Sequence, residues 1–333
     1  MNKNEQKNDN NDARAQACVA RLAALKARIA ETEGKELSDA EFARRFLTFS
    51  ATTWSKLTSG TYPGGRWDAM IDKMEASADA IEAQLPGLAE RARYAREFVK
   101  TALAKAAFAA VNKARTDGGD RRVVVVLAPT GHGKTALAEY FRGKGAIAVE
   151  GRQSWRASYK SFCSDVCLAA GRKIAPSVSE GRAEMEMMSI LGNRAGILFI
   201  DEANTMSGSC ANAIKYIVNK TDYTVVIAAI PQMWDKFLAG ARDEVLQLVN
   251  RCQPVIRSTR VGVKDVEAFL ARQGLPAAFA PDLAAEANRF GGFRTVLAVA
   301  DALAALGATP SREDLDGELR RQRENIAASG IGK

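Results

Sequence analysis

The stretch "VVVVLAPTGHGKTALAEY", residues 123–140, decides the fold. Four valines predict a buried strand, the next residues form a turn with two glycines, and the segment after Lys134-Thr135 has the composition of a helix. A strand, a glycine loop and a helix in this order direct backbone N–H groups and a helix N-terminus at an anion. The spacing matches the phosphate-loop pattern G-x-x-x-x-G-K-[ST], except that Ala128 stands where the pattern has its first glycine.

This loop predicts a site for ATP and Mg²⁺. We expect Lys134 to contact the β- and γ-phosphates and the Thr135 hydroxyl to bind Mg²⁺. Ala128 is tolerated if its backbone does not need a positive φ, because it adds one methyl group. The only histidine, His132, occupies a variable position and is expected to be solvated or near the base rather than catalytic. The residues expected to line the nucleotide are Pro129, Thr130, Gly131, His132, Gly133, Lys134, Thr135 and Ala136.

A second apolar run, "GILFIDEAN" at residues 196–204, ends in two acidic residues. Beside a phosphate loop, an Asp-Glu pair at a strand end is typical of nucleotide hydrolysis. We expect Asp201 to hold Mg²⁺ through water and Glu202 to polarise the attacking water. The alternative is an acidic cap on a core strand.

The pattern around these motifs predicts an α/β domain with a parallel sheet covered on both faces. The runs "VVVVLA", "AIAVEG", "GILFID" and "TVVIAAI" alternate with helical segments. We place this core at residues 119–258, a helical lid at 259–306, and a C-terminal helix and tail at 307–333. Upstream we expect a polar tail and an Ala-rich helix over residues 1–34, with 1–12 disordered. We expect a small helical domain over residues 35–87, which ends at "LPG", residues 85–87. A basic linker helix over residues 88–118 follows it.

The segment "LSDAEFARRFLTFSATTWSKLTSGTYPGG", residues 37–65, predicts two short helices that resemble a helix-turn-helix. Ser38 and Glu41 form a capping box, and Ser50 or Thr52 caps the next helix. Trp54 and Leu57 face inward. The outward residues, expected to contact DNA, are Thr52, Thr53, Ser55 and Lys56. A purely structural helical bundle is the alternative.

Composition limits the class of protein. The chain has 333 residues, 47% of them hydrophobic, no apolar run long enough to span a membrane, and a polar first dozen residues unlike a signal peptide, so we expect a cytoplasmic protein. Five cysteines without a C-x-x-C pair argue against zinc and disulfides. The net charge is +8, and residues 88–122 hold nine basic and four acidic residues, which favours a nucleic acid partner over a merely solvated basic helix.

The motifs resemble those of AAA+ ATPases over about residues 119–306. "APTGHGKT" is similar to that family's phosphate loop, followed by "ILFIDEA", the strand "TVVIAAI" and a helical lid. The resemblance implies rings or filaments with ATP at subunit interfaces. It also implies an arginine finger acting in trans at Arg251, with Arg257 as the rival, and a second-sensor arginine at Arg294 in "RFGGFRTVLAVADAL". The alternative for these arginines is an ordinary surface salt bridge.

One position departs from that family's pattern. The strand that should end in a polar first-sensor residue ends in the apolar residues Ala228, Ala229 and Ile230, and the nearest amide along the chain is Gln232. We therefore expect ATP to bind and hydrolysis to be slow.

The order of the parts, with a small helix-turn-helix domain before a basic helix and an AAA+ core, resembles the B proteins of Mu-type transposable phages. That resemblance implies an ATPase that polymerises on duplex DNA with little sequence preference, delivers target DNA to a transposase and dissociates on hydrolysis. Two alternatives remain: a helicase loader or similar remodeller, and a nucleotide-switched regulator that reads an operator.

Overall fold

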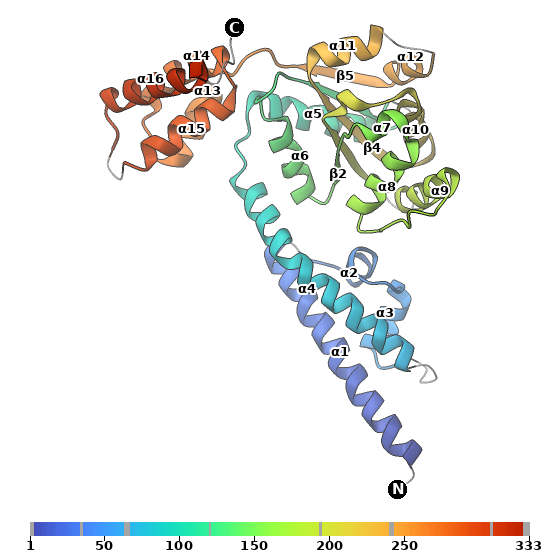
Figure 1. The fold of residues 1–333 in the computed structure, drawn as a ribbon. Coiled ribbons are helices and arrows are strands. Elements are labelled where there is room, and N and C mark those ends of the chain that lie inside the picture. The colour runs from blue at the N-terminus through green and yellow to red at the C-terminus, as the bar shows by residue number, and fades with distance from the viewer. Residues whose placement is uncertain are drawn as a thin grey trace. The chain divides into compact units, whose positions relative to one another are not determined.

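The computed structural model describes residues 3–33, 36–62, 67–119, 121–192, 195–239, 243–306 and 309–328. The chain divides into two compact units, Met1–Glu97 and Phe98–Lys333 (Figure 1). Each unit has hydrophobic clusters of its own, so each is described separately.

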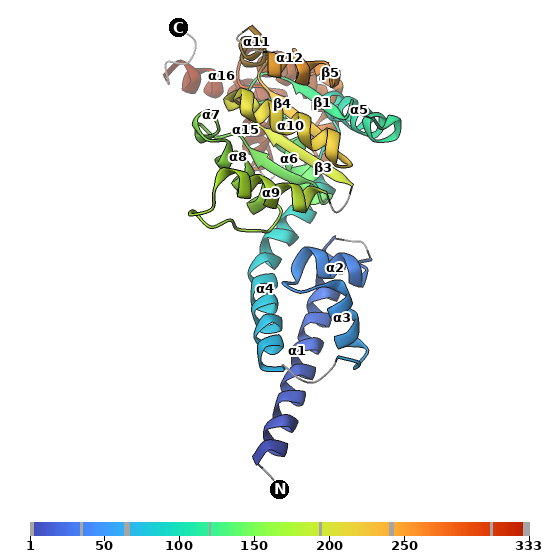
Figure 2. The same cartoon turned by 90° about the vertical axis from the view of Figure 1, so that its right-hand side faces the viewer.

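The first unit is all-helical. Its helices are α1 (Lys3–Glu33), α2 (Asp39–Phe46), α3 (Ala51–Thr58) and α4 (Trp67–Glu97). The long helices α1 and α4 pack side by side, and α2 packs against α3 and α4 (Figure 2). The side chains of this core include Leu22, Leu25, Ile29, Phe42, Trp54, Ile71, Met74 and Ile81.

Two expectations for this unit were wrong. Helix α1 begins at Lys3, although we expected disorder up to residue 12, and Asn11 bonds to Asp68 of α4 at 2.8 Å. Helix α4 continues through Pro86 and ends at Glu97, so the expected end at residues 85–87 is not observed. A proline inside a helix costs about 3 kcal/mol. Burial of the neighbouring Leu85 in the helical core offsets part of this cost.

The break between helices lies further along, after Glu97. The expected basic linker helix is therefore split between α4 and α5 (Ala102–Asp117), which the Thr101 side chain caps. Phe98 packs its ring 4.8 Å from that of Tyr140, in the second unit. The side chains of residues 87–97 lie outside the described set. Within the helices, the predicted basic surface can therefore be described only for α5.

The second unit contains the predicted parallel sheet, and the α/β fold class is confirmed. Its strands are β1 (Val123–Leu127), β2 (Ile147–Glu150), β3 (Gly196–Asp201), β4 (Tyr223–Ala229) and β5 (Cys252–Arg257). They lie in the order β2-β3-β4-β1-β5, and all pairs are parallel. The four apolar runs became β1 to β4. Strand β5 was not predicted: it contains Pro254 and the half-exposed Val255, which suit an edge strand.

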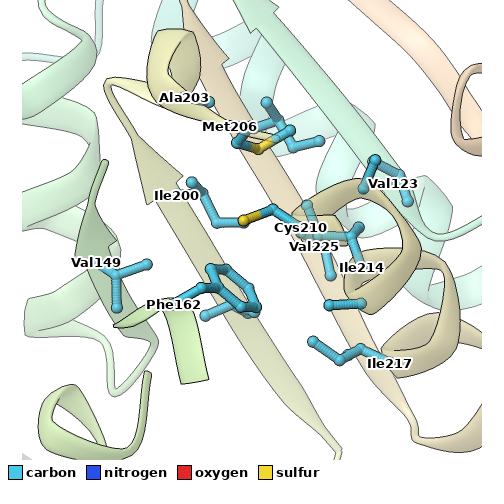
Figure 3. Close-up of a cluster of buried hydrophobic side chains, with 14 of the residues drawn as sticks. Val123, Val149, Phe162, Ile200, Ala203, Met206, Cys210, Ile214, Ile217 and Val225 are labelled. Atoms are coloured by element: carbon cyan, nitrogen blue, oxygen red, sulfur yellow. The ribbon is translucent and has the colours of Figure 1, made fainter. Parts of the chain in front are cut away.

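Helices cover both faces of this sheet, because alternate residues of each buried strand point to opposite sides. One face packs on α5 and α6 (Lys134–Gly143) through residues such as Val124 and Val126. The other face packs through Val123, Val225 and Ile200 (Figure 3). The helices whose residues join that cluster are α7 (Ser154–Ala157), α8 (Tyr159–Ala169), α9 (Glu180–Leu191), α10 (Gly208–Lys220), α11 (Pro231–Ala239) and α12 (Asp243–Val249).

The C-terminal helices form one further cluster. They are α13 (Val263–Gln273), the 3-10 helix η2 (Ala277–Phe279), α14 (Ala280–Arg289), α15 (Phe293–Ala304) and α16 (Arg312–Ala328). Leu315 and Leu319 of α16 belong to the same apolar cluster as α13 to α15. Arg323 also binds the buried Glu286 with three hydrogen bonds of 2.7 to 3.1 Å. The C-terminal helix thus packs as part of the lid.

Candidate active site

The glycine loop lies between β1 and α6, at the carboxyl edge of the sheet. Gly131 and Gly133 have φ angles of 80° and 90°, which explains why glycine stands at both positions. Ala128 continues the strand, since its N–H donates to the Ala229 carbonyl at 3.2 Å. It is not among the residues with positive φ. The substitution of alanine for glycine at this position is therefore accommodated without backbone strain.

Lys134, the first residue of α6, is 4% exposed and lies within the loop. Its Nζ donates to the carbonyls of Ala128 at 2.8 Å and Pro129 at 3.0 Å. Burial lowers the pKa of Lys134, the carboxylates of Glu202 and Asp201 act in the opposite direction, and the charge of Arg294 lowers it again. The site thus holds two cations and two carboxylates around one loop.

Thr135 and Asp201 meet although 66 residues separate them in the sequence. The Thr135 hydroxyl donates to Asp201 Oδ2 at 2.7 Å, and the Asp201 carboxyl is almost fully buried at the end of β3. A hydroxyl and a carboxylate are the hard oxygen ligands that Mg²⁺ takes. These two residues therefore fit a Mg²⁺ ion beside the loop.

Glu202 has a constrained backbone. Its φ of 48° makes it the only non-glycine residue with positive φ in the part of the chain that the structure describes. Such a conformation costs about 1–3 kcal/mol and persists only where the surroundings impose it. Gly151, after β2, permits it: a Cβ there would lie 2.3 Å from the Glu202 carbonyl oxygen. The Glu202 N–H donates to Asp201 Oδ1 at 2.9 Å.

Sequence reasoning missed Asn204, which lies in the 3-10 helix η1 (Ala203–Thr205). Its Nδ2 donates to Glu202 Oε2 at 2.7 Å, and its Oδ1 accepts from the Ile230 N–H at 3.1 Å. The amide at the end of β4 is therefore Asn204, and not Gln232 as the distance along the chain indicated. The motif "DEAN" was the available signal, but only the fold shows that its last residue reaches β4.

The lid contacts the loop through glycines. A Cβ on Gly131 would lie 1.9 Å from the Gly291 carbonyl oxygen, and one on Gly292 would lie 2.8 Å from the Gly131 carbonyl. The Phe293 N–H donates to the Gly131 carbonyl at 2.8 Å. Arg294 follows, near enough for its charge to act on Lys134. Arg294 thus follows the segment of the lid that contacts the loop, and its role as second sensor stays a prediction.

His132 is buried rather than solvated, with 8% of its surface exposed. Burial lowers its pKa, and the charge of Lys134 lowers it further. A Cβ on Gly292 would lie 2.9 Å from its Cδ2 atom. Of the two expected positions, the solvated one is therefore wrong, because the lid covers this side chain, and the position near the base stays a prediction.

The two arginine-finger candidates lie at opposite edges of the sheet. In the register of β1 and β5, Cys252 pairs with Val123 and Arg257 pairs with Leu127. Arg251 thus precedes the amino end of β5, about 20 Å from the loop edge along a six-residue strand, and donates to Asn219 and the Gln247 carbonyl. Arg257 lies at the loop edge and pairs with Asp235 at 3.1 Å.

The predicted DNA-contact residues lie on α3 of the first unit. Thr52, Ser55 and Lys56 are exposed, as expected. Thr53 is partly buried, and its hydroxyl bonds to Ser50 Oγ at 2.9 Å within the helix cap. It is therefore less available to an external ligand than the sequence indicated.

The described residues include no group of three or more His, Cys, Asp or Glu side chains that could hold a metal ion. The five cysteines are buried free thiols, and burial raises the pKa of Cys252 to about 12. No described helix is long and apolar enough to cross a membrane.

Comparison with known proteins assigns the central part of the chain. The family described as "AAA domain" matches residues 116–237. No curated protein matches the sequence. Among solved structures, the ORC2 protein of Aeropyrum pernix, in ADPNP and ADP complexes, is 10% identical with a TM-score of 0.47. PCH-2 of C. elegans is 12% identical with a TM-score of 0.38; both matches cover 66% of this chain and 66% of the other. Residues 116–237, which include the glycine loop and the Asp201-Glu202 pair, are therefore similar to an AAA domain.

Proposed function

We propose that the second unit binds and hydrolyses ATP. The observation that carries the proposal is the convergence of Lys134, Thr135, Asp201 and Glu202 on one glycine loop, with the Thr135 hydroxyl 2.7 Å from the Asp201 carboxylate. Each of these residues is of the chemical type that phosphoryl transfer requires.

In this proposal each of these residues has a separate role in ATP binding or hydrolysis. Lys134 exchanges its loop carbonyls for phosphate oxygens and, with Arg294 on the lid, neutralises the charge of the triphosphate. Mg²⁺, held by Thr135 and Asp201, would supply further charge neutralisation at the phosphates. Glu202 accepts a proton from the attacking water. Arg251 is too far from the loop of its own chain, so its predicted role requires a neighbouring subunit.

Two substitutions separate binding from hydrolysis. Glu202→Gln should bind a fluorescent ATP analogue normally and lose at least about a hundredfold in phosphate release, because the amide accepts no proton. Lys134→Ala should weaken binding at least tenfold, or about 1.4 kcal/mol. Glu267→Gln, at an exposed position of α13, is the matched control. Unchanged turnover in Glu202→Gln, or unchanged affinity in Lys134→Ala, contradicts the proposal.

We further propose that the ATP-bound protein assembles on duplex DNA and delivers it to a transposase. Support comes from the order of the parts, with a small helical unit before the ATPase domain, and from charge. Lys105, Lys113 and Arg115 are exposed on α5, and none of the ion pairs among the described residues involves them. Together with Lys56, these cations are suited to the phosphate backbone, which carries no sequence information.

A salt series tests the DNA proposal. Affinity for unrelated duplexes should fall steeply with salt and differ little between sequences, because counterion release dominates. The double variant Lys105→Ala/Lys113→Ala should reduce the slope of log affinity against log salt by up to about 1.8. Lys236→Ala, an exposed cation on α11, is the control. A spread above about a hundredfold between sequences favours an operator-binding regulator instead.

Electron microscopy separates the remaining alternatives. With random duplex DNA and a non-hydrolysable ATP analogue, the proposal expects filaments. A protein that forms none, and instead binds a hexameric helicase, is a helicase loader.

A further inference from the structure

Glu202 is held by a side chain that the proposed mechanism has not yet used. Asn204 donates its Nδ2 to Glu202 Oε2 at 2.7 Å and accepts from the Ile230 N–H at 3.1 Å through Oδ1. Only one orientation of the amide satisfies both bonds, since the reverse would set oxygen against carboxylate and N–H against N–H. The two bonds therefore define the direction of this side chain.

The position of Ile230 gives the second bond its significance. Ile230 directly follows β4, whose last residues, Ala228 and Ala229, are fully buried and apolar. The side chains of Ala228, Ala229 and Ile230 contain no hydrogen-bonding group. Asn204, in η1, provides the hydrogen-bonding group at the end of β4 and connects the Ile230 N–H to the Glu202 carboxylate.

The backbone conformation of Glu202 gives an independent reason why its carboxylate needs a side-chain partner. Its left-handed conformation is restrained by Gly151 on one side and by the Asp201 carboxylate on the other. These restraints act on main-chain atoms and leave the carboxylate free to rotate. Asn204 fixes the carboxylate by one oxygen and leaves the other to accept a proton from water.

We propose that Asn204 is a positioning residue for ATP hydrolysis, which orients the Glu202 carboxylate and ties it to the end of β4. The inference rests on the proposed hydrolysis by this site. It predicts that Asn204 contributes to turnover and not to nucleotide affinity, because the two hydrogen bonds of its side chain go to Glu202 and Ile230 rather than to the phosphate loop.

Two variants with different chemistry test it. Asn204→Asp keeps the acceptor for Ile230 and the size of the side chain, but loses the donor and sets a second carboxylate against Glu202. Asn204→Ala removes both bonds. We expect kcat for phosphate release to fall at least tenfold in both, with the affinity for a fluorescent ATP analogue within twofold of the unmodified protein. Asn112→Asp, exposed on α5, controls for the added charge in the absence of DNA.

A second substitution, at Glu202, separates positioning from mere structural support. In a Glu202→Gln background, neither change at Asn204 should lower turnover further.

The outcomes distinguish this inference from the proposal beneath it. If Glu202→Gln retains turnover, the hydrolysis assignment itself fails. If Glu202→Gln loses turnover while Asn204→Asp and Asn204→Ala hydrolyse ATP like the unmodified protein, only the role of Asn204 fails. A fall in nucleotide affinity equal to the fall in kcat also overturns it, since that marks damage to the whole site.

Discussion

His132 illustrates what burial does to a single titratable group. The ring lies beside Lys134 and under Gly292, and both burial and the neighbouring cation disfavour its charged form. A neutral imidazole at this position adds no charge to the loop at neutral pH. The loop therefore owes its positive charge to Lys134 and, from the lid, to Arg294.

The pKa of His132 should lie below the ordinary value of about 6.5. Between that value and the lower folded-state pKa, the unfolded chain binds a proton that the folded chain does not. The contribution of His132 to the free energy of unfolding is therefore fully present above about pH 6.5 and falls as pH decreases through this window. Because the chain has one histidine, NMR titration of the imidazole reads the midpoint directly. Urea unfolding of His132→Gln should lack this contribution, and a midpoint at or above 6.5 contradicts the prediction.

Most residues that meet at the loop could be predicted from the sequence, because their motifs are local. "GHGKT" and "DEAN" each carry their own spacing, and a parallel sheet brings strand ends to one edge. The role of Asn204 could not be predicted. It depends on the left-handed turn at Glu202 and on the distance from η1 to β4, neither of which is encoded in a short spacing.

Among the elements, the contact between the lid and the loop depends on glycine. At Gly292 the backbone has φ 62°, and an added methyl would meet Gly131 and His132. At Gly274, after α13, the backbone has a similar φ of 70° but open space around it. The two glycines share a positive φ and differ in how closely other atoms pack around them.

Gly292→Ala and Gly274→Ala should therefore separate strain from contact. Gly274→Ala should lose about 1–2 kcal/mol of stability from its left-handed backbone, and Gly292→Ala about 1–3 kcal/mol, because φ 62° and ψ −139° lie in a region that few residues other than glycine adopt. Only Gly292→Ala should also weaken ATP binding, by tenfold or more, because the methyl displaces the loop. Thermal melting and titration of a fluorescent ATP analogue measure both effects. Equal affinities in the two variants would show that the contact does not influence the nucleotide.

The elements themselves were predictable where their sequence is strongly patterned. Runs of β-branched residues gave β1 to β4, and the capping serines gave α2 and α3. The course of α4 through Pro86 was not predictable, because tertiary packing overrode a local breaker. Strand β5 was missed for a related reason: an edge strand with a proline and a half-exposed valine lacks the buried pattern of its neighbours.

In the whole molecule, hydrophobic burial is divided between the two units. The cluster that contains Trp54 draws only on residues of the first unit, and the clusters around the sheet and the lid draw only on the second. Phe98 begins the second unit by packing against Phe108 and Tyr140. Each unit thus has an apolar core of its own, as a domain that folds by itself requires.

A fragment of residues 98–333 should therefore fold and bind the ATP analogue with the affinity of the full chain. The full chain should unfold in two calorimetric transitions, one of which the fragment lacks. The fragment should also lose any DNA contact that α3 supplies, with α5 retained. An insoluble fragment, or one without nucleotide affinity, would show that the units depend on each other.

The hydrogen bond from Phe293 to Gly131 joins main-chain atoms on both sides. Replacement of either neighbouring side chain leaves this bond in place, so conventional alanine scanning does not detect it. Its strength depends on the tilt of one peptide plane, which the positive φ of Gly131 leaves comparatively easy to rotate. A small rotation of that plane alters the bond at the first residue of α15, one position before Arg294. The orientation of this peptide plane therefore links the loop, where the proposed nucleotide would bind, to the first turn of α15.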